Sequence, residues 1–135
     1  MATITCFEEV ESWKKARELC LKIGLLIDSG RFINNFRLIG QVEGSSGSIM
    51  DNISEGFERG SRAEFIQFLG YAKGSCGEFR SQLYRALDRN YLTQIEFDDL
   101  KEQAMHISRL IQKLIGYLQN TTIGGTRRRV QPKEL

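Results

Sequence analysis

The stretch SRAEFIQFLGYAKGSCGEFRSQLYRALD, residues 61–88, decides the fold class. It opens on Ser61 with Glu64 three residues later, the pattern of a capping box, in which the two side chains bond free backbone N–H groups at the start of a helix. Apolar residues then recur at intervals of three and four, which places them on one face of a helix. That face consists of Phe65, Leu69, Ala72, Cys76, Phe79, Leu83 and Ala86. The stretch therefore predicts a long amphipathic helix that begins near residue 62.

Three further segments carry the same spacing. The pairs Thr5–Glu8 and Thr93–Glu96 repeat the capping box and predict helix starts near residues 6 and 94. Asp28-Ser29-Gly30, Gly60 and Asn90 are the predicted stops. The predicted core positions are Trp13, Ala16, Cys20, Ile23 and Ile27 in the first segment; Ile39, Val42, Ser46, Ile49, Ile53 and Gly56 in the second; and Phe97, Leu100, Ala104, Ile107, Ile111, Leu114 and Leu118 in the last.

Four helices joined by short connections predict an all-α fold, an antiparallel up-down-up-down four-helix bundle. The chain of 135 residues fits one domain, which we place at residues 1–120. Residues 121–135, TTIGGTRRRVQPKEL, contain Gly-Gly, the single proline and no apolar period, so we expect a basic, flexible C-terminal tail. The chain has a single proline and no stretch in which β-branched residues alternate with polar ones. Both features argue against a β-sandwich, in which strands and turns would recur at short intervals.

Positive charge gathers in two places. Residues 1–120 hold 15 Lys and Arg against 16 Asp and Glu, whereas residues 121–135 have a net charge of +3. Within the body, residues 59–92 have an excess of three positive charges. Arginines pair with phosphate oxygens without reading bases, so these are candidate nucleic-acid contacts; alternatively, those in the body form an ordinary solvated helix face. The candidates are Arg80, Arg85, Arg89, Arg127, Arg128 and Arg129.

The sequence contains no recognisable catalytic or metal-binding pattern. Cys6, Cys20 and Cys76 have neither disulfide-framework nor zinc-ligand spacing, and His106 is the single histidine. No apolar run approaches the ~20 residues that span a bilayer, and the acidic N-terminus is unlike a signal peptide. We therefore expect no catalytic residue, metal or cofactor, no membrane partner, and a cytoplasmic location.

Glycines form a second stripe on the two middle helices. Gly70, Gly74 and Gly77 recur at helical spacing beside the core face, and Gly40 and Gly44 repeat the theme earlier in the chain. Each glycine in an exposed helix costs about 1 kcal/mol relative to alanine. The close approach of another backbone would offset that cost. The stripe therefore indicates either a subunit interface, or a tight contact between the second and third helices or a kink.

Polar residues also follow the core faces of the middle helices. We expect them to be half-buried, and half-buried polar groups need hydrogen-bond partners. They form either an interhelical network that fixes the register or the lining of a binding groove. The residues are Ser48, Asn52 and Glu55 on the second helix and Ser75, Glu78 and Gln82 on the third.

Three stretches resemble a known family. They are Phe7-Glu8-Glu9-Val10 with Trp13, then Ser48-Ile49-Met50-Asp51-Asn52-Ile53-Ser54-Glu55-Gly56, then Glu64-Phe65-Ile66-Gln67-Phe68-Leu69. The chain is similar in these stretches, over about residues 7–118, to the four-helix-bundle proteins encoded in intervening sequences of bacterial 23S rRNA genes. The resemblance implies a small antiparallel bundle that assembles as a homopentamer and has no known enzymatic activity. It also implies a distant link to the pentameric accessory protein of diversity-generating retroelements, whose basic surface is implicated in contacts with reverse transcriptase and RNA.

The chain departs from the family pattern on the second helix. Relatives usually carry arginines just after the residue equivalent to Gln41, where this chain has Val42-Glu43-Gly44. Relatives also often have proline at the position of Met50. The first change replaces a basic contact with an acid. The hypothesis that follows is a homo-oligomeric binding module linked to RNA or an RNA-handling partner; the alternative is a protein adaptor or structural assembly with no nucleic-acid role.

Overall fold

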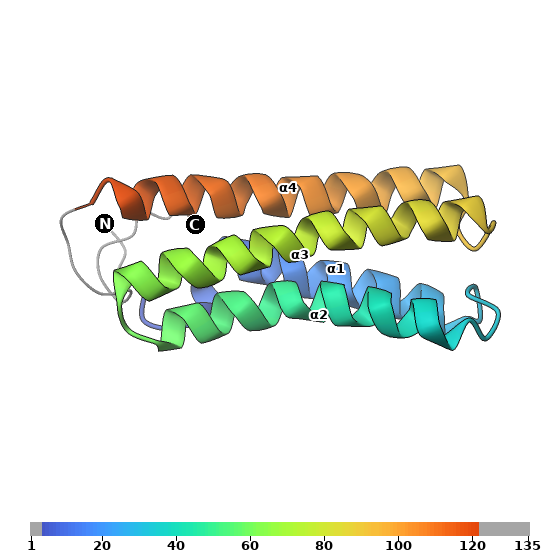
Figure 1. Cartoon of the computed structure of the whole chain (residues 1–135), viewed down its shortest axis with the longest axis horizontal. Helices are drawn as coiled ribbons and strands as arrows, with labels where there is room; N and C mark the ends of the chain where they lie inside the picture. The colour runs from blue at the N-terminus through green and yellow to red at the C-terminus, as the bar shows by residue number, and fades with distance from the viewer. Residues whose placement is uncertain (1–3, 122–135) are drawn as a thin grey trace.

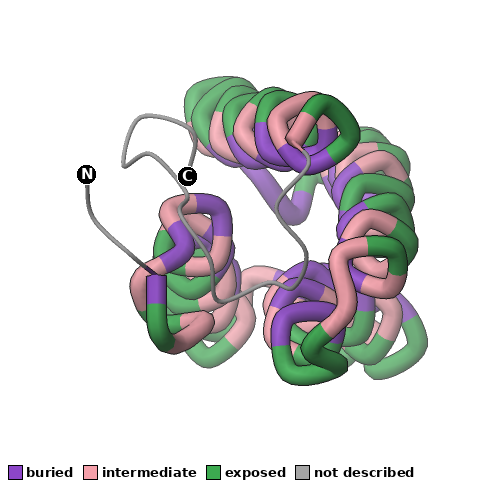
Figure 2. The backbone as a smooth tube through the Cα atoms, turned by 90° about the vertical axis from the view of Figure 1, so that its left-hand side faces the viewer, coloured by how far each residue is buried: buried purple, intermediate pink, exposed green. Residues whose placement is uncertain are grey.

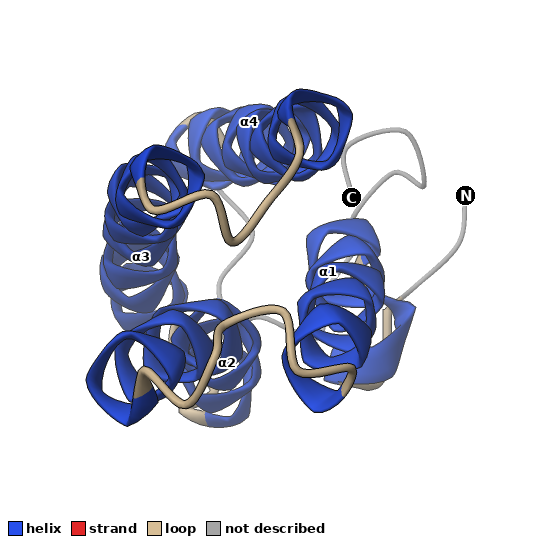
Figure 3. Cartoon of the chain, turned by 90° about the vertical axis from the view of Figure 1, so that its right-hand side faces the viewer, coloured by secondary structure: helices blue, strands red, loops and turns tan. Residues whose placement is uncertain are grey.

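The computed structural model describes residues 4–121, which form an all-α, up-down-up-down bundle (Figure 1). Each helix packs against two others, so that α1, α2, α3 and α4 form a square in which the backbones of diagonal pairs lie farther apart (Figure 3). The predicted fold class is confirmed, while the predicted flexible tail lies outside the described residues, Thr121 excepted. The elements are the 3-10 turn η1 (Phe7–Glu9), α1 (Glu11–Asp28), α2 (Phe36–Glu58), α3 (Arg62–Asp88) and α4 (Gln94–Gln119).

Two of the three predicted helix starts are confirmed. Ser61 caps α3 by accepting a hydrogen bond from the backbone N–H of Glu64. Thr93 caps α4, where the hydroxyl accepts from the N–H of Glu96 and the Glu96 carboxylate accepts from the N–H of Thr93. This arrangement satisfies two of the helix-start N–H groups that lack a partner in the turn before them.

The predicted helix start near residue 6 is wrong. The hydroxyl of Thr5 donates to the carboxylate of Glu9, 2.8 Å away, and the Cys6 thiol donates to the same oxygen. Glu9 rather than Glu8 is thus the partner of Thr5, and the chain forms the 3-10 turn η1. The first α-helix begins only at Glu11, after the extended residue Val10, and has no side-chain cap.

The loops after α1 and α3 use the same backbone motif. Gly30 and Asn90 have φ values of +82° and +63°, the left-handed conformation that glycine and asparagine adopt most readily. In each case the next residue's N–H reaches back five residues: Arg31 donates to the Leu26 carbonyl, and Tyr91 to the Ala86 carbonyl. These Schellman motifs satisfy free carbonyls at the helix ends and confirm the predicted stops.

The core lies along the inner sides of all four helices (Figure 2). Every predicted core position of α3 and α4 is buried, and in α2 only Ile39 is not fully buried. The prediction for α1 is partly wrong, because Leu19 is buried where Cys20 was expected to be, and Trp13 and Ile27 are half-buried. No described helix carries an apolar stretch long enough to cross a membrane.

An ion pair ties the turn between α1 and α2 to the start of α4. Both Nη atoms of Arg31 donate to the Glu96 carboxylate at 2.6 Å. Arg31 is the largest cause of a Glu96 pKa lowered to about 2, and the capping bonds from Thr93 add to the effect.

This pair predicts a specific acid sensitivity. A carboxyl whose pKa is lower in the folded than in the unfolded state contributes stability that is present above pH ~4.5 and is lost as the pH falls toward 2. We expect Glu96→Gln, which preserves the capping geometry, to weaken the dependence of the unfolding midpoint on pH in this range. Chemical denaturation at pH 7, 4 and 2.5 measures it. An unchanged pH dependence would contradict the assignment.

Candidate functional site

The interface between α2 and α3 holds a ladder of polar side chains, which contains most of the predicted polar network. The hydroxyl of Ser75 on α3 donates to the Ser48 hydroxyl on α2 at 3.0 Å. The Asn52 amide donates to the same hydroxyl and to the Ser48 carbonyl, both at 2.9 Å. The predicted residues Ser48, Asn52 and Ser75 therefore form one connected cluster across the two helices.

Two more rungs continue the ladder toward the α3–α4 loop. Ser45 donates to the side-chain carbonyl of the buried Gln82 at 2.6 Å, and Arg85 donates to that of Gln41 at 2.9 Å. Sequence reasoning missed Ser45 as a partner of Gln82. The sequence spacing indicates this position, since Ser45 lies three residues before Ser48 and therefore on the same side of α2.

The two acidic residues of the predicted network lie outside this ladder. Glu55 is exposed and pairs with Arg59 one turn later on its own helix, at 2.9 Å. Glu78 is exposed at the edge of the α2–α3 groove, which Ser45 and Gln82 also line, and no hydrogen bond or ion pair joins it to another described residue. The ladder thus contains no acidic residue, and Arg85 at its end is its one charged member; it fixes the register of α2 against α3.

The predicted interface glycines lie on the outer surface of the subunit. Gly40, Gly44, Gly70 and Gly74 are exposed, and a Cβ atom added to any of them would meet nothing within 4 Å. A Cβ at Gly77 would meet only the Arg80 guanidinium, at 3.8 Å. These glycines therefore do not serve a tight contact between α2 and α3 within the chain.

The candidate arginines of α3 do not form one surface. Arg85 comes five positions after Arg80, which turns their side chains apart by roughly 140° around the helix. Arg85 faces α2, where it bonds Gln41, and Arg89 stacks 5.8 Å from the centre of the Tyr91 ring at the end of the bundle. Arg127, Arg128 and Arg129 lie outside the described residues.

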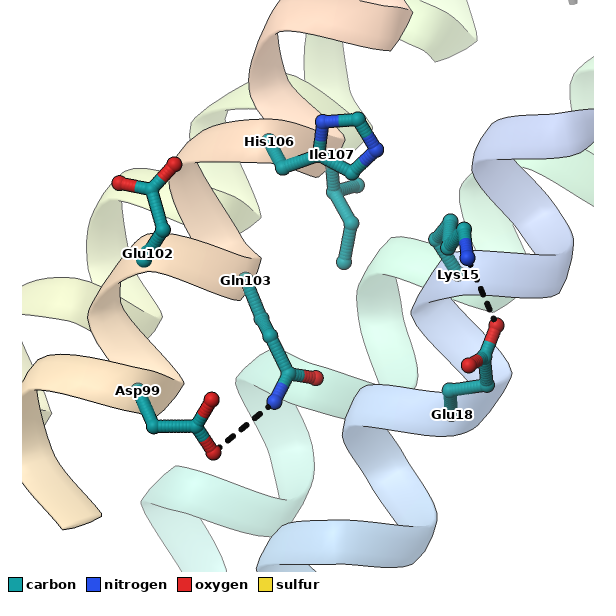
Figure 4. A pocket seen from close by; sticks show the side chains of 7 residues that line it. All are labelled: Lys15, Glu18, Asp99, Glu102, Gln103, His106 and Ile107. Carbon is teal, nitrogen blue, oxygen red and sulfur yellow. Dashed lines mark hydrogen bonds and ion pairs between the residues drawn. The ribbon is translucent and has the colours of Figure 1, made fainter.

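A groove of about 290 Å³ separates α1 from α4 (Figure 4). Its walls carry both charges, and its cations and acids are largely paired: Lys15 with Glu18, and Lys22 with Asp99, which also accepts from Gln103. The exposed His106 lies on the α4 wall of this groove. Within residues 4–121, no three histidine, cysteine, aspartate or glutamate side chains are placed to hold a metal ion.

The surroundings of all three cysteines favour the protonated thiol. Burial raises the pKa of Cys76 to about 12 and also raises the pKa of Cys20. The pKa of Cys6 is raised as well, chiefly by its hydrogen bond to Glu9. The thiolate is the nucleophile and metal ligand, so these environments disfavour both kinds of chemistry.

Comparison with known proteins identifies the family but not an activity. A solved structure described as a protein of unknown function from the S23 ribosomal protein family of Bacteroides thetaiotaomicron is 24% identical. It superposes with a TM-score of 0.70 over 77% of this chain and 97% of its own, so the two share a fold. No functionally curated protein shows significant similarity. The sequence model of the 23S rRNA-intervening sequence protein family matches residues 8–113, and the chain belongs to this family.

Proposed function

We propose that this chain is the subunit of a homo-oligomer, a pentamer, that acts as a non-enzymatic binding module for RNA or an RNA-handling partner. The observation that carries the assembly is the open space around the glycines of α2 and α3. Gly70 and Gly74 have no neighbour within the subunit that excludes a side chain. Their absent side chains nevertheless cost the helix about 1 kcal/mol each relative to alanine. A second subunit that packs its backbone against this surface offsets the cost.

Gly56, in contrast, is required by close packing within the subunit. A Cβ atom at this position would lie 2.5 Å from the Cβ of Phe68 and 3.3 Å from the Phe65 ring, so no side chain fits there. The glycines on the outer surface lack any such neighbour. This contrast within one chain supports an intermolecular role for the outer glycines.

The proposal contains no catalytic step. The Cys20 and Cys76 thiols are kept protonated by burial, and the serine hydroxyls between α2 and α3 are engaged with one another and with Asn52 and Gln82. Groups held in this way stabilise a register rather than attack a substrate.

A protein adaptor is the second candidate function, favoured by one observation. Apolar side chains are exposed at the end of the bundle that holds the α1–α2 and α3–α4 loops. Ile33 is 73%, Phe36 72% and Ile95 82% exposed. A contiguous apolar patch is typical of a protein contact site, and these three side chains are the candidates for one at this end. Two results together would favour the adaptor. The intact chain would bind a protein partner but no RNA, and the double variant Ile33→Ser, Phe36→Ser would no longer bind that partner.

Deletion of residues 122–135 tests the contribution of the basic tail. Each copy carries a net charge of +3 over this stretch, so a pentamer brings about +15 together, and multivalency strengthens weak phosphate contacts. We expect the truncated chain to bind structured RNA more weakly and with a shallower salt dependence, measured by filter binding at two salt concentrations. Equal affinity and an equal salt slope would exclude the tail from binding.

A further inference from the structure

The side of α3 that faces α4 carries cations without acidic partners. Tyr84 identifies this side, since its ring packs edge-on against Phe97 of α4 with centres 4.8 Å apart. Residues three and four apart on a helix share a side. The row along α3 is therefore Lys73, Gly77, Arg80 and Tyr84, and the row along α4 is Lys101, Met105, Ser108 and Gln112.

These two rows, which we call the α3–α4 basic row, contain three positive charges and no negative charge, and Asp88, four residues after Tyr84, and Asp98, three residues before Lys101, flank them. The Lys101 ammonium lies 5.5 Å from the centre of the Tyr84 ring and 5.9 Å from that of Phe97. Aromatic rings hold this cation without neutralising it. The acidic residues close to Lys101 along α4 are engaged elsewhere: Asp98 with Gln94, Asp99 with Lys22 and Glu102 with Arg109.

Arg80 lies at the middle of the row with part of its guanidinium group unsatisfied. Its Nε atom is buried and has no hydrogen-bond partner within residues 4–121. One Nη atom lies beside Gly77, 3.8 Å from where a Cβ would stand. No carboxylate of the described residues forms an ion pair with Lys73, Arg80 or Lys101. The buried Nε is not accessible to a ligand, so a phosphate group would accept hydrogen bonds from the Nη atoms of Arg80.

Two other seams of the bundle differ from the α3–α4 seam in their polar side chains. The α2–α3 seam is filled by the ladder, in which Ser45, Ser48, Ser75 and Gln82 are neutral. The α1–α4 seam pairs its charges, as in Lys22 with Asp99. Arg17 beside Trp13 and Arg89 beside Tyr91 also lack an ion pair within the described residues, so the α3–α4 seam differs from these two seams in holding three such cations together.

We infer that the α3–α4 basic row binds single-stranded RNA. Lys73, Arg80 and Lys101 contact the phosphodiester backbone, and the half-exposed ring of Tyr84 contacts a base. This inference rests on the proposed RNA-linked function and assigns its site. It replaces a surface composed of Arg80, Arg85 and Arg89 by one that crosses to α4.

The aromatic ring favours RNA over an acidic peptide as the ligand. Proteins that bind single strands combine cations that follow the backbone with aromatic side chains that stack on bases. Arg80 and Tyr84 are one helical turn apart, about 6 Å along the axis, so one flexible nucleotide can place its phosphate and its base near both. An acidic peptide has charge for the cations but no base for the ring.

The test compares charge-matched variants of the full chain. The row variant is Lys73→Gln, Arg80→Gln, Lys101→Gln. The control is Lys14→Gln, Arg37→Gln, Lys113→Gln, which removes three exposed cations outside the row. The probe is a fluorescein-labelled 20-nucleotide RNA of mixed sequence and no self-complementarity, followed by fluorescence anisotropy at three salt concentrations. A third variant, Tyr84→Leu, removes the ring but no charge.

We expect the row variant to lose at least about tenfold in affinity and to reduce the salt slope by about 2, as three lost phosphate contacts require. Tyr84→Leu should lose affinity by about tenfold with an unchanged salt slope. The control should keep the wild-type slope to within about 0.5. Circular dichroism should show that all variants remain helical.

Two results would overturn the assignment while sparing the wider proposal. If the row and control variants lose affinity equally, or only the tail deletion matters, RNA binding does not use the row. If polyglutamate competes as well as unlabelled RNA and Tyr84→Leu has no effect, the row is a site for acidic proteins. A wild-type chain that binds no RNA would overturn the RNA-linked function together with this inference.

Discussion

Replacing Gly74 with leucine is expected to dissociate the oligomer while leaving each subunit folded. The added side chain projects from the outer surface of α3 into space that is empty in the subunit. It therefore leaves the core residues of α3 untouched, and leucine has a better helix propensity than glycine by nearly 1 kcal/mol. In the assembly the same side chain would collide with the neighbouring subunit.

Light scattering after size exclusion measures the mass of the assembly, and circular dichroism on the same samples measures the helicity of the subunit. Lys113→Leu is the matched control, because it adds an exposed leucine on α4 away from the glycine surface. A Gly74→Leu chain that stays oligomeric would place the glycines in solvent. A loss of helicity together with the oligomer would show that the subunit needs its neighbours to fold.

Replacing Gly56 with alanine is expected to destabilise the subunit itself. The new Cβ atom would lie 2.5 Å from the Cβ of Phe68, and a Cβ cannot rotate away as the end of a long side chain can. The backbones of α2 and α3 must therefore separate, and overpacking of this kind costs about 1–3 kcal/mol. We expect a fall in Tm of several degrees or more in thermal unfolding followed by circular dichroism.

The substitution Gly70→Ala is the internal comparison for Gly56→Ala. The chemical change is the same, but the Cβ at Gly70 meets nothing within 4 Å, so the isolated helix gains about 1 kcal/mol. Measured on dissociated subunits, opposite signs for the two variants would confirm that only Gly56 is required by packing within the subunit. A Gly56→Ala chain as stable as the wild type would contradict the close packing of α2 against α3.

Local signals in the sequence were sufficient for most of the fold. The starts of α3 and α4 are set by Ser61 and Thr93, whose hydroxyls act on backbone groups only three residues away. The stops at Gly30 and Asn90 depend on local left-handed conformations. Interactions between residues a few positions apart can be inferred from the sequence spacing alone. The core faces of α3 and α4 follow in the same way from the helical spacing of their apolar residues.

The start of α1 could not be inferred in the same way. Thr5 has acidic residues both three and four positions later, and the choice of Glu9 over Glu8 depends on the 3-10 turn that η1 makes. The buried side of α1 was also misplaced, because Leu19 and Cys20 both fit the period. Only packing against α2 and α4 decides which of the two faces the core.

The candidate site was harder to predict, because its residues come together across helices. Ser48 and Ser75 were identified from their position beside the core, but Ser45 was not recognised as the partner of Gln82. Lys101 is 17 residues after Tyr84 in the sequence, yet its ammonium lies over the Tyr84 ring. No period within one helix reveals such a pair, since it depends on how α3 and α4 are aligned.

The mass of the wild-type chain in solution tests the central claim most directly. Multi-angle light scattering on the full 135-residue protein, at tens of micromolar and moderate salt, is the measurement. The account predicts a single species of about 78 kDa, five times the 15.5 kDa of the chain. A species of 15.5 kDa under these conditions would contradict it, because the glycine surfaces of α2 and α3 would then have no partner to contact.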